Sequence, residues 1–172
     1  MGSLSLEVKA RCHDPAGVRR ILISQGAVFK GLDRQIDTYF RIPFGRLKLR
    51  EGRIENALIY YQRADQKNSK KCDSILAACR NRAAVKEVLA STLGVLTVVD
   101  KQREIFFIKN TKFHIDRVKR LGRFVEIEVF GPRGARGEAK LRRQCEAYRR
   151  LLGIRKKDLL ADSYSDQLLK AA

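Results

Sequence analysis

Apolar and polar residues alternate along several short stretches of the chain, which is typical of β-strands with one apolar face. In 4–11 every second residue is apolar. Similar stretches rich in Ile, Leu, Val, Tyr and Phe are separated by turn residues such as Pro43, Gly52 and Gly122. The pattern predicts strands over 4–11, 33–43, 45–51, 56–64, 72–79, 96–109, 112–119 and 123–130.

Apolar residues at helical spacing predict helices between the groups of strands. Asp14 and Pro15 suit an N-cap and a first helical position, and Gly26 follows the last turn. Predicted helices cover 15–25, 82–93, 138–152 and, more briefly, 156–161, and another helical turn follows 163–166. Strands dominate and the helices lie between them, so we expect the α+β class with a largely antiparallel sheet.

Length and composition indicate one globular domain. The 172 residues contain no repeat or low-complexity linker. We therefore predict a single domain over 1–172, with a core of about 4–131 and C-terminal helices over about 133–169. No apolar stretch could span a membrane, and the N-terminus lacks the apolar segment of a signal peptide, so a cytoplasmic location is expected. The four cysteines form no C-x-x-C pair, which favours reduced thiols.

Charge is the most unusual bulk property. The chain has 37 Lys and Arg against 19 Asp and Glu, a net charge of +18. Such a protein attracts polyanions of any kind, so the value alone does not choose between nucleic acid, an anionic membrane and polyphosphate.

The charges are segregated along the predicted strands. A period of two places Arg46, Lys48 and Arg50 on one face of 45–51. The same counting joins Tyr61 with Arg63, Lys101 with Arg103, His114 with Asp116, Glu126 with Glu128, and Glu7 with Lys9 and Arg11. Such faces lie open to water or, if the sheet closes, line a wet lumen.

Segregation by sign favours the lumen, because neighbouring like charges need a bound counter-charge. A triphosphate with a divalent metal meets both needs, since Arg and Lys bind phosphate oxygens and carboxylates suit Mg²⁺ or Mn²⁺. The chemistry expected there is phosphoryl or nucleotidyl transfer.

Seven segments, in order, resemble the CYTH family, which is named for class IV adenylyl cyclases and thiamine triphosphatases and is also called the triphosphate tunnel metalloenzymes. Together with the closing Asp158-Leu159-Leu160 and 163–166, the resemblance runs from about residue 4 to 169. The segments are Leu6-Glu7-Val8-Lys9-Ala10-Arg11, Gln35-Ile36-Asp37-Thr38-Tyr39-Phe40, Gly45-Arg46-Leu47-Lys48-Leu49-Arg50-Glu51, Leu58-Ile59-Tyr60-Tyr61-Gln62-Arg63, Lys101-Gln102-Arg103, His114-Ile115-Asp116-Arg117-Val118 and Leu121-Gly122-Arg123-Phe124-Val125-Glu126-Ile127-Glu128.

The resemblance implies a closed eight-stranded antiparallel tunnel, open at both ends, with helices packed outside. It also implies three kinds of site residue. The triphosphate ligands would be Lys9, Arg46, Lys48, Arg50, Arg63, Lys101 and Arg103; the metal ligands Glu7, Glu126 and Glu128; the supporting residues Asp116 and His114. Glu7, Lys9, Glu126 and Glu128 would form the catalytic set around Mg²⁺ or Mn²⁺.

One position departs from the family pattern Glu-x-Glu-x-Lys, because its first Glu is Ser5 here. A neutral hydroxyl is a weaker metal ligand than a carboxylate. The pattern still resembles class IV adenylyl cyclase-like members, so we expect an enzyme that converts ATP to cyclic AMP and pyrophosphate. A triphosphatase acting on thiamine triphosphate, tripolyphosphate or a nucleoside triphosphate is the alternative, and a non-catalytic module binding polyphosphate, nucleotide or RNA is a third hypothesis.

Other features carry less weight. Tyr60 and Tyr61 could stack on a base, although packing is the commoner role of strand tyrosines. The basic stretch 133–157 predicts a solvated helix surface more than an RNA-binding one, because no RNA-binding motif accompanies it. A nucleic-acid partner is therefore open but not favoured, as is a homodimer, and no membrane association is expected.

Overall fold

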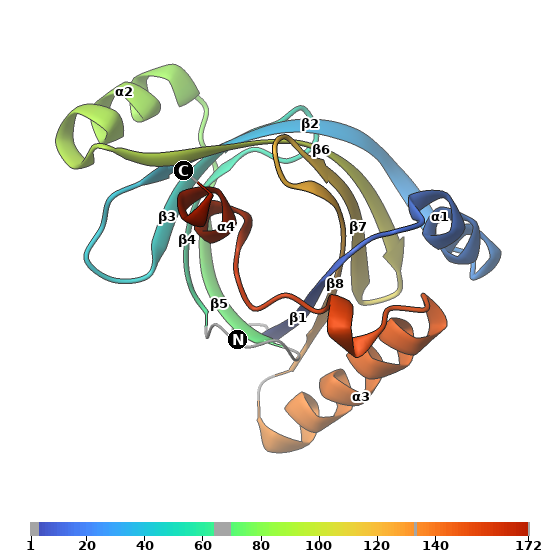
Figure 1. Cartoon of the computed structure of the whole chain (residues 1–172). Coiled ribbons are helices and arrows are strands. Elements are labelled where there is room, and N and C mark those ends of the chain that lie inside the picture. Colours follow the sequence, from blue (N-terminus) through green and yellow to red (C-terminus); the bar gives the residue numbers. More distant parts are fainter. Residues whose placement is uncertain (1–3, 64–69, 133, 172) are drawn as a thin grey trace.

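The computed structural model describes residues 4–63, 70–132 and 134–171. Its strands form a closed antiparallel barrel with the spatial order β1-β5-β4-β3-β2-β6-β7-β8, seen end-on in Figure 1. The fold prediction is thereby confirmed. The strands are β1 (Leu4–Arg11), β2 (Val28–Phe40), β3 (Arg46–Glu51), β4 (Ala57–Arg63), β5 (Lys70–Ala77), β6 (Val95–Ile108), β7 (Thr111–Val118) and β8 (Gly122–Gly131).

Strand β1 closes the barrel because it pairs on both edges, with β5 and with β8. In the β1–β8 register, Glu7 lies opposite Glu128 and Lys9 opposite Glu126. Successive residues of a strand point to opposite faces, so the polar residues of β1 face the lumen and its apolar residues face outward.

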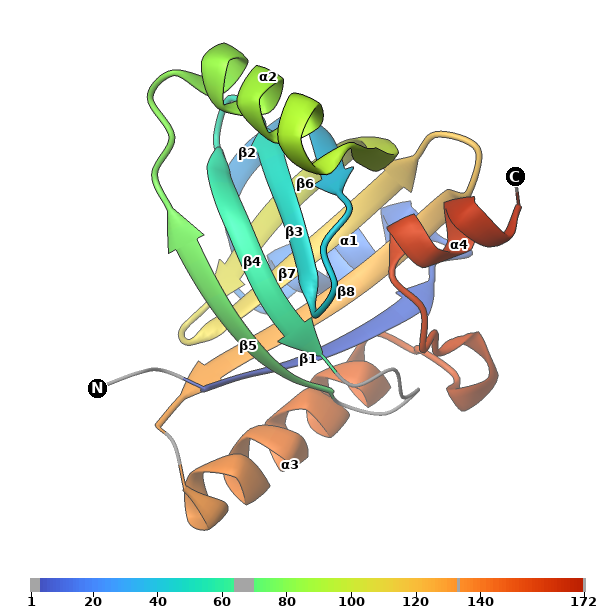
Figure 2. The same cartoon turned by 90° about the vertical axis from the view of Figure 1, so that its left-hand side faces the viewer.

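The helices are α1 (Pro15–Ser24), α2 (Arg82–Leu93), α3 (Ala135–Leu151) and α4 (Tyr164–Lys170), with a 3-10 turn at Lys156–Asp158. Helices α1 and α3 cover the outside of β1, β7 and β8, as Figure 2 shows for α3. Leu6, Phe113, Ile127, Leu141 and Cys145 are fully buried there. This outer core leaves the lumen free for polar side chains. None of the helices in the described ranges is long and apolar enough to cross a bilayer.

Two predicted boundaries are wrong for local reasons. Strand β2 begins at Val28, not near 33, because a register shift between Phe29 and Gly31 breaks the alternation while pairing with β6 continues. The helix predicted over 156–161 is only a 3-10 turn at Lys156–Asp158, because Leu159 returns to extended backbone and bridges Ala10.

Helix α4 lies at one end of the barrel (Figure 1). Its capping box joins Ser163 and Asp166, and its Tyr164 and Leu168 are buried in a cluster with Val118 and Phe124. Helix α4 therefore packs against this end of the barrel.

Candidate functional site: a charged tunnel

All eight strands contribute side chains to a lumen cavity of about 430 Å³. Most of the predicted site residues meet there, as the alternation along the strands required. The predicted residues that line it are Glu7, Lys9, Lys48, Arg50, Lys101, Arg103, His114, Glu126 and Glu128.

The basic wall, formed by Lys48, Arg50, Lys101 and Arg103, is organised around a carboxylate. Asp37 on β2 accepts hydrogen bonds from Lys48 at 2.9 Å, from Lys101 at 2.7 Å, and from two guanidinium nitrogens of Arg50 at 2.8 Å. Asp37 is 1% exposed and Lys101 is 2% exposed. Three cations thus share one buried carboxylate, which leaves this wall with excess positive charge.

Titration behaviour reflects this imbalance. Burial alone would raise the pKa of Asp37, but Arg50, Lys101 and Lys48 outweigh burial and hold that pKa well below its usual value. Burial lowers the pKa of Lys101 despite its contact with Asp37, and Arg50 and Arg103 lower it further. A bound anion would relieve that repulsion.

Arg103 is held in place by a second buried acid. Its guanidinium donates to both carboxylate oxygens of Asp116, at 2.7 and 2.6 Å, and Tyr164 donates its hydroxyl to the same carboxylate at 2.7 Å. Asp116 stands behind Arg103 and does not line the cavity. The supporting role of Asp116 stays a prediction.

The acidic wall consists of Glu7, Glu126 and Glu128 on the adjacent strands β1 and β8. Glu126 lies 3.5 Å from Lys9 and 3.5 Å from Arg103. Burial opposes its ionisation, but Lys9 and Arg103 hold the pKa of Glu126 well below its usual value. Glu126 therefore faces the basic wall as an ionised carboxylate.

Glu128 behaves in the opposite way. Burial, then the charges of Glu126 and Glu7, raise the pKa of Glu128 to about 7, although a hydrogen bond from Ser5 acts against them. Ser5 thus contacts the acidic wall at the position where the family pattern has a carboxylate.

The three glutamates suit a hard divalent cation in their chemistry, since mutual repulsion between carboxylates is what such a cation removes. In the described residues, however, no three His, Cys, Asp or Glu side chains converge closely enough to hold a metal ion. The three carboxylates therefore fit Mg²⁺ or Mn²⁺ by their chemistry, and they are not gathered around one point in this structure.

His114 is buried between the two walls. Its Nδ1 lies 3.6 Å from a Glu126 oxygen, and neither ring nitrogen has a hydrogen-bond partner. Burial, then Arg103, lowers its pKa to about 4. His114 is therefore neutral at physiological pH.

One predicted phosphate ligand, Arg46, stands apart from the cavity. Arg46 pairs with Asp166 of α4 at 2.8 Å and does not line the cavity. Arg63 ends β4, but its side chain lies outside the described residues.

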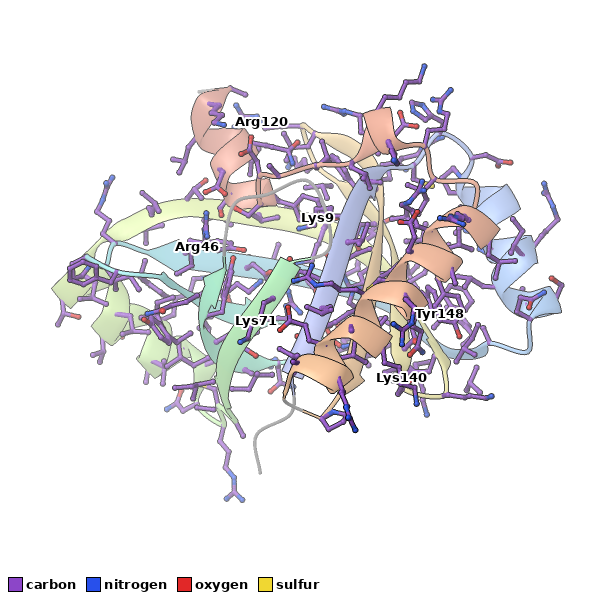
Figure 3. All side chains as sticks on the ribbon, turned by 90° about the horizontal axis from the view of Figure 1, so that it is seen from below. Lys9, Arg46, Lys71, Arg120, Lys140 and Tyr148 are labelled. Carbon is purple, nitrogen blue, oxygen red and sulfur yellow. The ribbon has the colours of Figure 1, made fainter. Side chains whose placement is uncertain are left out.

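Figure 3 shows Lys140 and Tyr148 on α3, outside the barrel.

Among the described residues, three charged side chains that line the lumen had no predicted role: Asp37, Glu55 and Lys112. Asp37 falls within a segment that matched the family, and its alternation with Gln35 and Tyr39 could have placed it inside. Lys112 lies two residues before His114 on the same face of β7. Glu55 lies in a loop, where no periodicity indicates its direction.

A family model and several solved structures match this molecule. The CYTH domain model matches residues 4–164. This chain belongs to the CYTH family. No curated protein matches this chain.

The most informative structural likeness is to the PH1012 protein of Pyrococcus horikoshii, with 25% identity, a TM-score of 0.76, and coverage of 94% of this chain and 98% of that one. A Vibrio parahaemolyticus protein provisionally named an adenylate cyclase shares 17% identity with a TM-score of 0.80, over 98% and 99% of the two chains. A Hippeastrum protein provisionally named an adenylyl cyclase, and described as having a dominant triphosphatase activity, shares 9% identity with a TM-score of 0.66, over 99% and 96%. The last two likenesses concern the fold alone.

Proposed function

We propose that this CYTH protein is a divalent-metal-dependent enzyme acting on a triphosphate, with conversion of ATP to cyclic AMP and pyrophosphate as its reaction. The observation that carries the proposal is the opposition of two charged walls in one enclosed cavity. Lys48, Arg50 and Lys101 exceed the charge of Asp37 on one side, and on the other burial, with the charges of Glu126 and Glu7, raises the pKa of Glu128. A triphosphate–metal complex supplies both missing charges.

The basic wall would bind and orient the phosphates. The guanidiniums of Arg50 and Arg103 are fixed by bidentate contacts with Asp37 and Asp116, so they need little reorganisation when substrate enters. Donors that are positioned in advance stabilise charge that develops during phosphoryl transfer. Lys48 and Lys101 would add point charges beside them.

The acidic wall would hold the metal through Glu7, Glu126 and Glu128. When bound, Mg²⁺ or Mn²⁺ would neutralise charge on the phosphate oxygens and hold them in position. Lys9 lies 3.5 Å from Glu126 of the acidic wall and 4.1 Å from the centre of the Tyr164 ring, and it lines the cavity. We propose that Lys9 contacts the substrate where phosphates and metal meet.

A product assay tests this proposal. The purified protein is incubated with Mn²⁺ or Mg²⁺ and, separately, with ATP, thiamine triphosphate and tripolyphosphate. Cyclic AMP together with pyrophosphate is the expected result with ATP. Release of orthophosphate without cyclic AMP would replace the cyclase by a triphosphatase, and no product from any of the three substrates would overturn the enzyme proposal in favour of a binding module.

A further inference from the structure

The loop between β3 and β4 is pinned to the barrel wall by a buried acid. Asp33, which has no exposed surface, accepts the backbone N–H groups of Arg53, Ile54 and Glu55 at 2.7, 3.1 and 3.0 Å. A side chain at Gly52 would come within 2.5 Å of both the Asp33 carboxylate and the Glu55 carbonyl oxygen. The loop backbone, and with it the origin of the Glu55 side chain, is therefore fixed.

The Glu55 carboxylate lines the tunnel cavity and is surrounded by donors. One oxygen accepts from Arg50 at 2.9 Å and from Gln35 at 3.1 Å, and the other contacts the ammonium of Lys112. Burial would raise its pKa, but Arg50, then Arg103, outweigh burial and lower it. Glu55 thus remains an anion bound to donors from three strands.

This surrounding set excludes two ordinary roles for a tunnel carboxylate. A general base must be free to take a proton near neutral pH, whereas Glu55 is a weak base with occupied oxygens. A metal ligand needs other anionic donors beside it, whereas the side chains that donate hydrogen bonds to Glu55 among the described residues are two cations and an amide. Arg, Lys and amide donors converging on two oxygens are instead the set that binds a phosphate oxygen.

The position of Glu55 along the tunnel bears on how long a phosphate chain these donors could bind. Lys112 is the second residue of β7, at the end of the barrel opposite α4, so it extends the row of lumen cations beyond Arg103 and Arg50. Glu55 bridges Arg50 and Lys112, so it lies beside the cations that the proposed function assigns to the triphosphate.

We propose that Glu55 is a specificity-determining residue, which fills an anion subsite at this end of the tunnel and limits the bound chain to three phosphates. This inference rests on the proposed triphosphate function. Replacing Glu55 by Gln removes the internal anion and leaves Arg50 and Lys112 to receive a fourth phosphate. Inorganic tetrapolyphosphate would then gain affinity relative to tripolyphosphate.

Calorimetric titration of the full chain with tripolyphosphate and tetrapolyphosphate, without added metal, tests the inference. Glu55→Gln is expected to raise the tetrapolyphosphate preference roughly tenfold, because a hydrogen bond to a charged group contributes at least that factor. Glu51→Gln is the matched control, since Glu51 lies at the same end of β3 but pairs with Lys86 at 2.8 Å outside the cavity. It should leave the preference unchanged.

Two further variants keep the result interpretable. Glu55→Asp retains the charge and should keep the wild-type preference even if Glu55→Gln folds poorly. Adding Lys112→Gln to Glu55→Gln should abolish the gain, because the fourth phosphate loses its ammonium partner. An equal gain for both ligands in Glu55→Gln would overturn the subsite, since it would reflect net charge only. Failure of the wild-type protein to bind tripolyphosphate would overturn the triphosphate function as well.

Discussion

The two charged walls of the tunnel are prepared to different degrees. On the basic wall, Asp37 and Asp116 fix Arg50 and Arg103 through paired hydrogen bonds of 2.6 to 2.8 Å. On the acidic wall, Glu126 is ionised, whereas the pKa of Glu128 rises to about 7. Under the proposed function, the difference means that the fold itself would build the anion site, and that the metal site would be completed only by the metal.

The largest expected effect comes from removing the carboxylate that organises the basic wall. Asp37→Asn leaves Lys48, Arg50 and Lys101 buried without a counter-charge, so the free energy of unfolding should fall by about 3–5 kcal/mol. Urea denaturation measures this decrease in the free energy of unfolding. Asp100→Asn is the control, because Asp100 is half exposed and 3.9 Å from Lys119, and its loss should cost roughly 0.5 kcal/mol or less. Equal stability of the two variants would show that the basic wall does not depend on Asp37.

The acidic wall makes a prediction about pH. Glu128 has a usual pKa of 4.5 and a folded pKa of about 7, so between these values the folded chain holds a proton that the unfolded chain has lost. Its contribution to stability therefore falls as pH rises from about 4.5 to 7, by up to roughly 3 kcal/mol.

Comparison with Glu128→Gln isolates this contribution. His114, with a folded pKa of about 4, acts in the opposite direction, since its contribution to the stability of the protein is lost as pH falls through this range. Both proteins retain His114, so the difference between their unfolding free energies, measured by urea denaturation at pH 5 and pH 7.5, reports Glu128. The free energy of unfolding of Glu128→Gln should rise relative to that of wild type at the higher pH. A difference that is the same at both pH values would mean that neither burial nor its acidic neighbours raise the pKa of Glu128.

Removing one lumen cation should affect activity more than stability. Lys101→Met is expected to lower the turnover of the triphosphate substrate about a hundredfold, the scale of losing one positioned donor. Lys119→Met, on the outer surface, should retain full turnover. Steady-state rates of the two variants test whether Lys101 has a role in catalysis. Equal rates would support a purely structural role for Lys101.

The smallest effect concerns the position where this chain departs from its family. Ser5→Glu adds a carboxylate beside Glu128, and Mn²⁺ affinity should rise about tenfold, because more anionic ligands strengthen binding of a hard cation. Titration of Mn²⁺ followed by electron paramagnetic resonance measures the free ion. Unchanged affinity would place the metal away from β1.

Alternation was sufficient to predict which strand residues face inward. Lys48, Arg50, Lys101, Arg103, Glu126 and Glu128 all line the cavity because a period of two leaves a strand residue only two directions. The family resemblance supplied what alternation could not, namely that the sheet closes. Closure depends on pairing between β1 and β8, more than a hundred residues apart.

Partners across the barrel could not be predicted in this way. Asp37 meets Lys101, 64 residues away, and this contact depends on closure and on the register of β2 with β6. Glu55 enters the lumen because Asp33 binds the loop backbone, and no pattern in 52–56 encodes that direction. Arg46 was placed on the correct face of β3, yet it pairs with Asp166 because α4 packs at that end.

The central claim is that opposite walls of one tunnel bind the two halves of a metal–triphosphate complex. A crystal structure of the protein with Mn²⁺ and a non-hydrolysable ATP analogue, using anomalous scattering to locate manganese, tests it most directly. The expected result is a manganese peak among Glu7, Glu126 and Glu128, with the phosphates against Lys48, Arg50, Lys101 and Arg103. Phosphates bound on the outer surface, with the lumen still occupied only by its own side chains, would contradict the account.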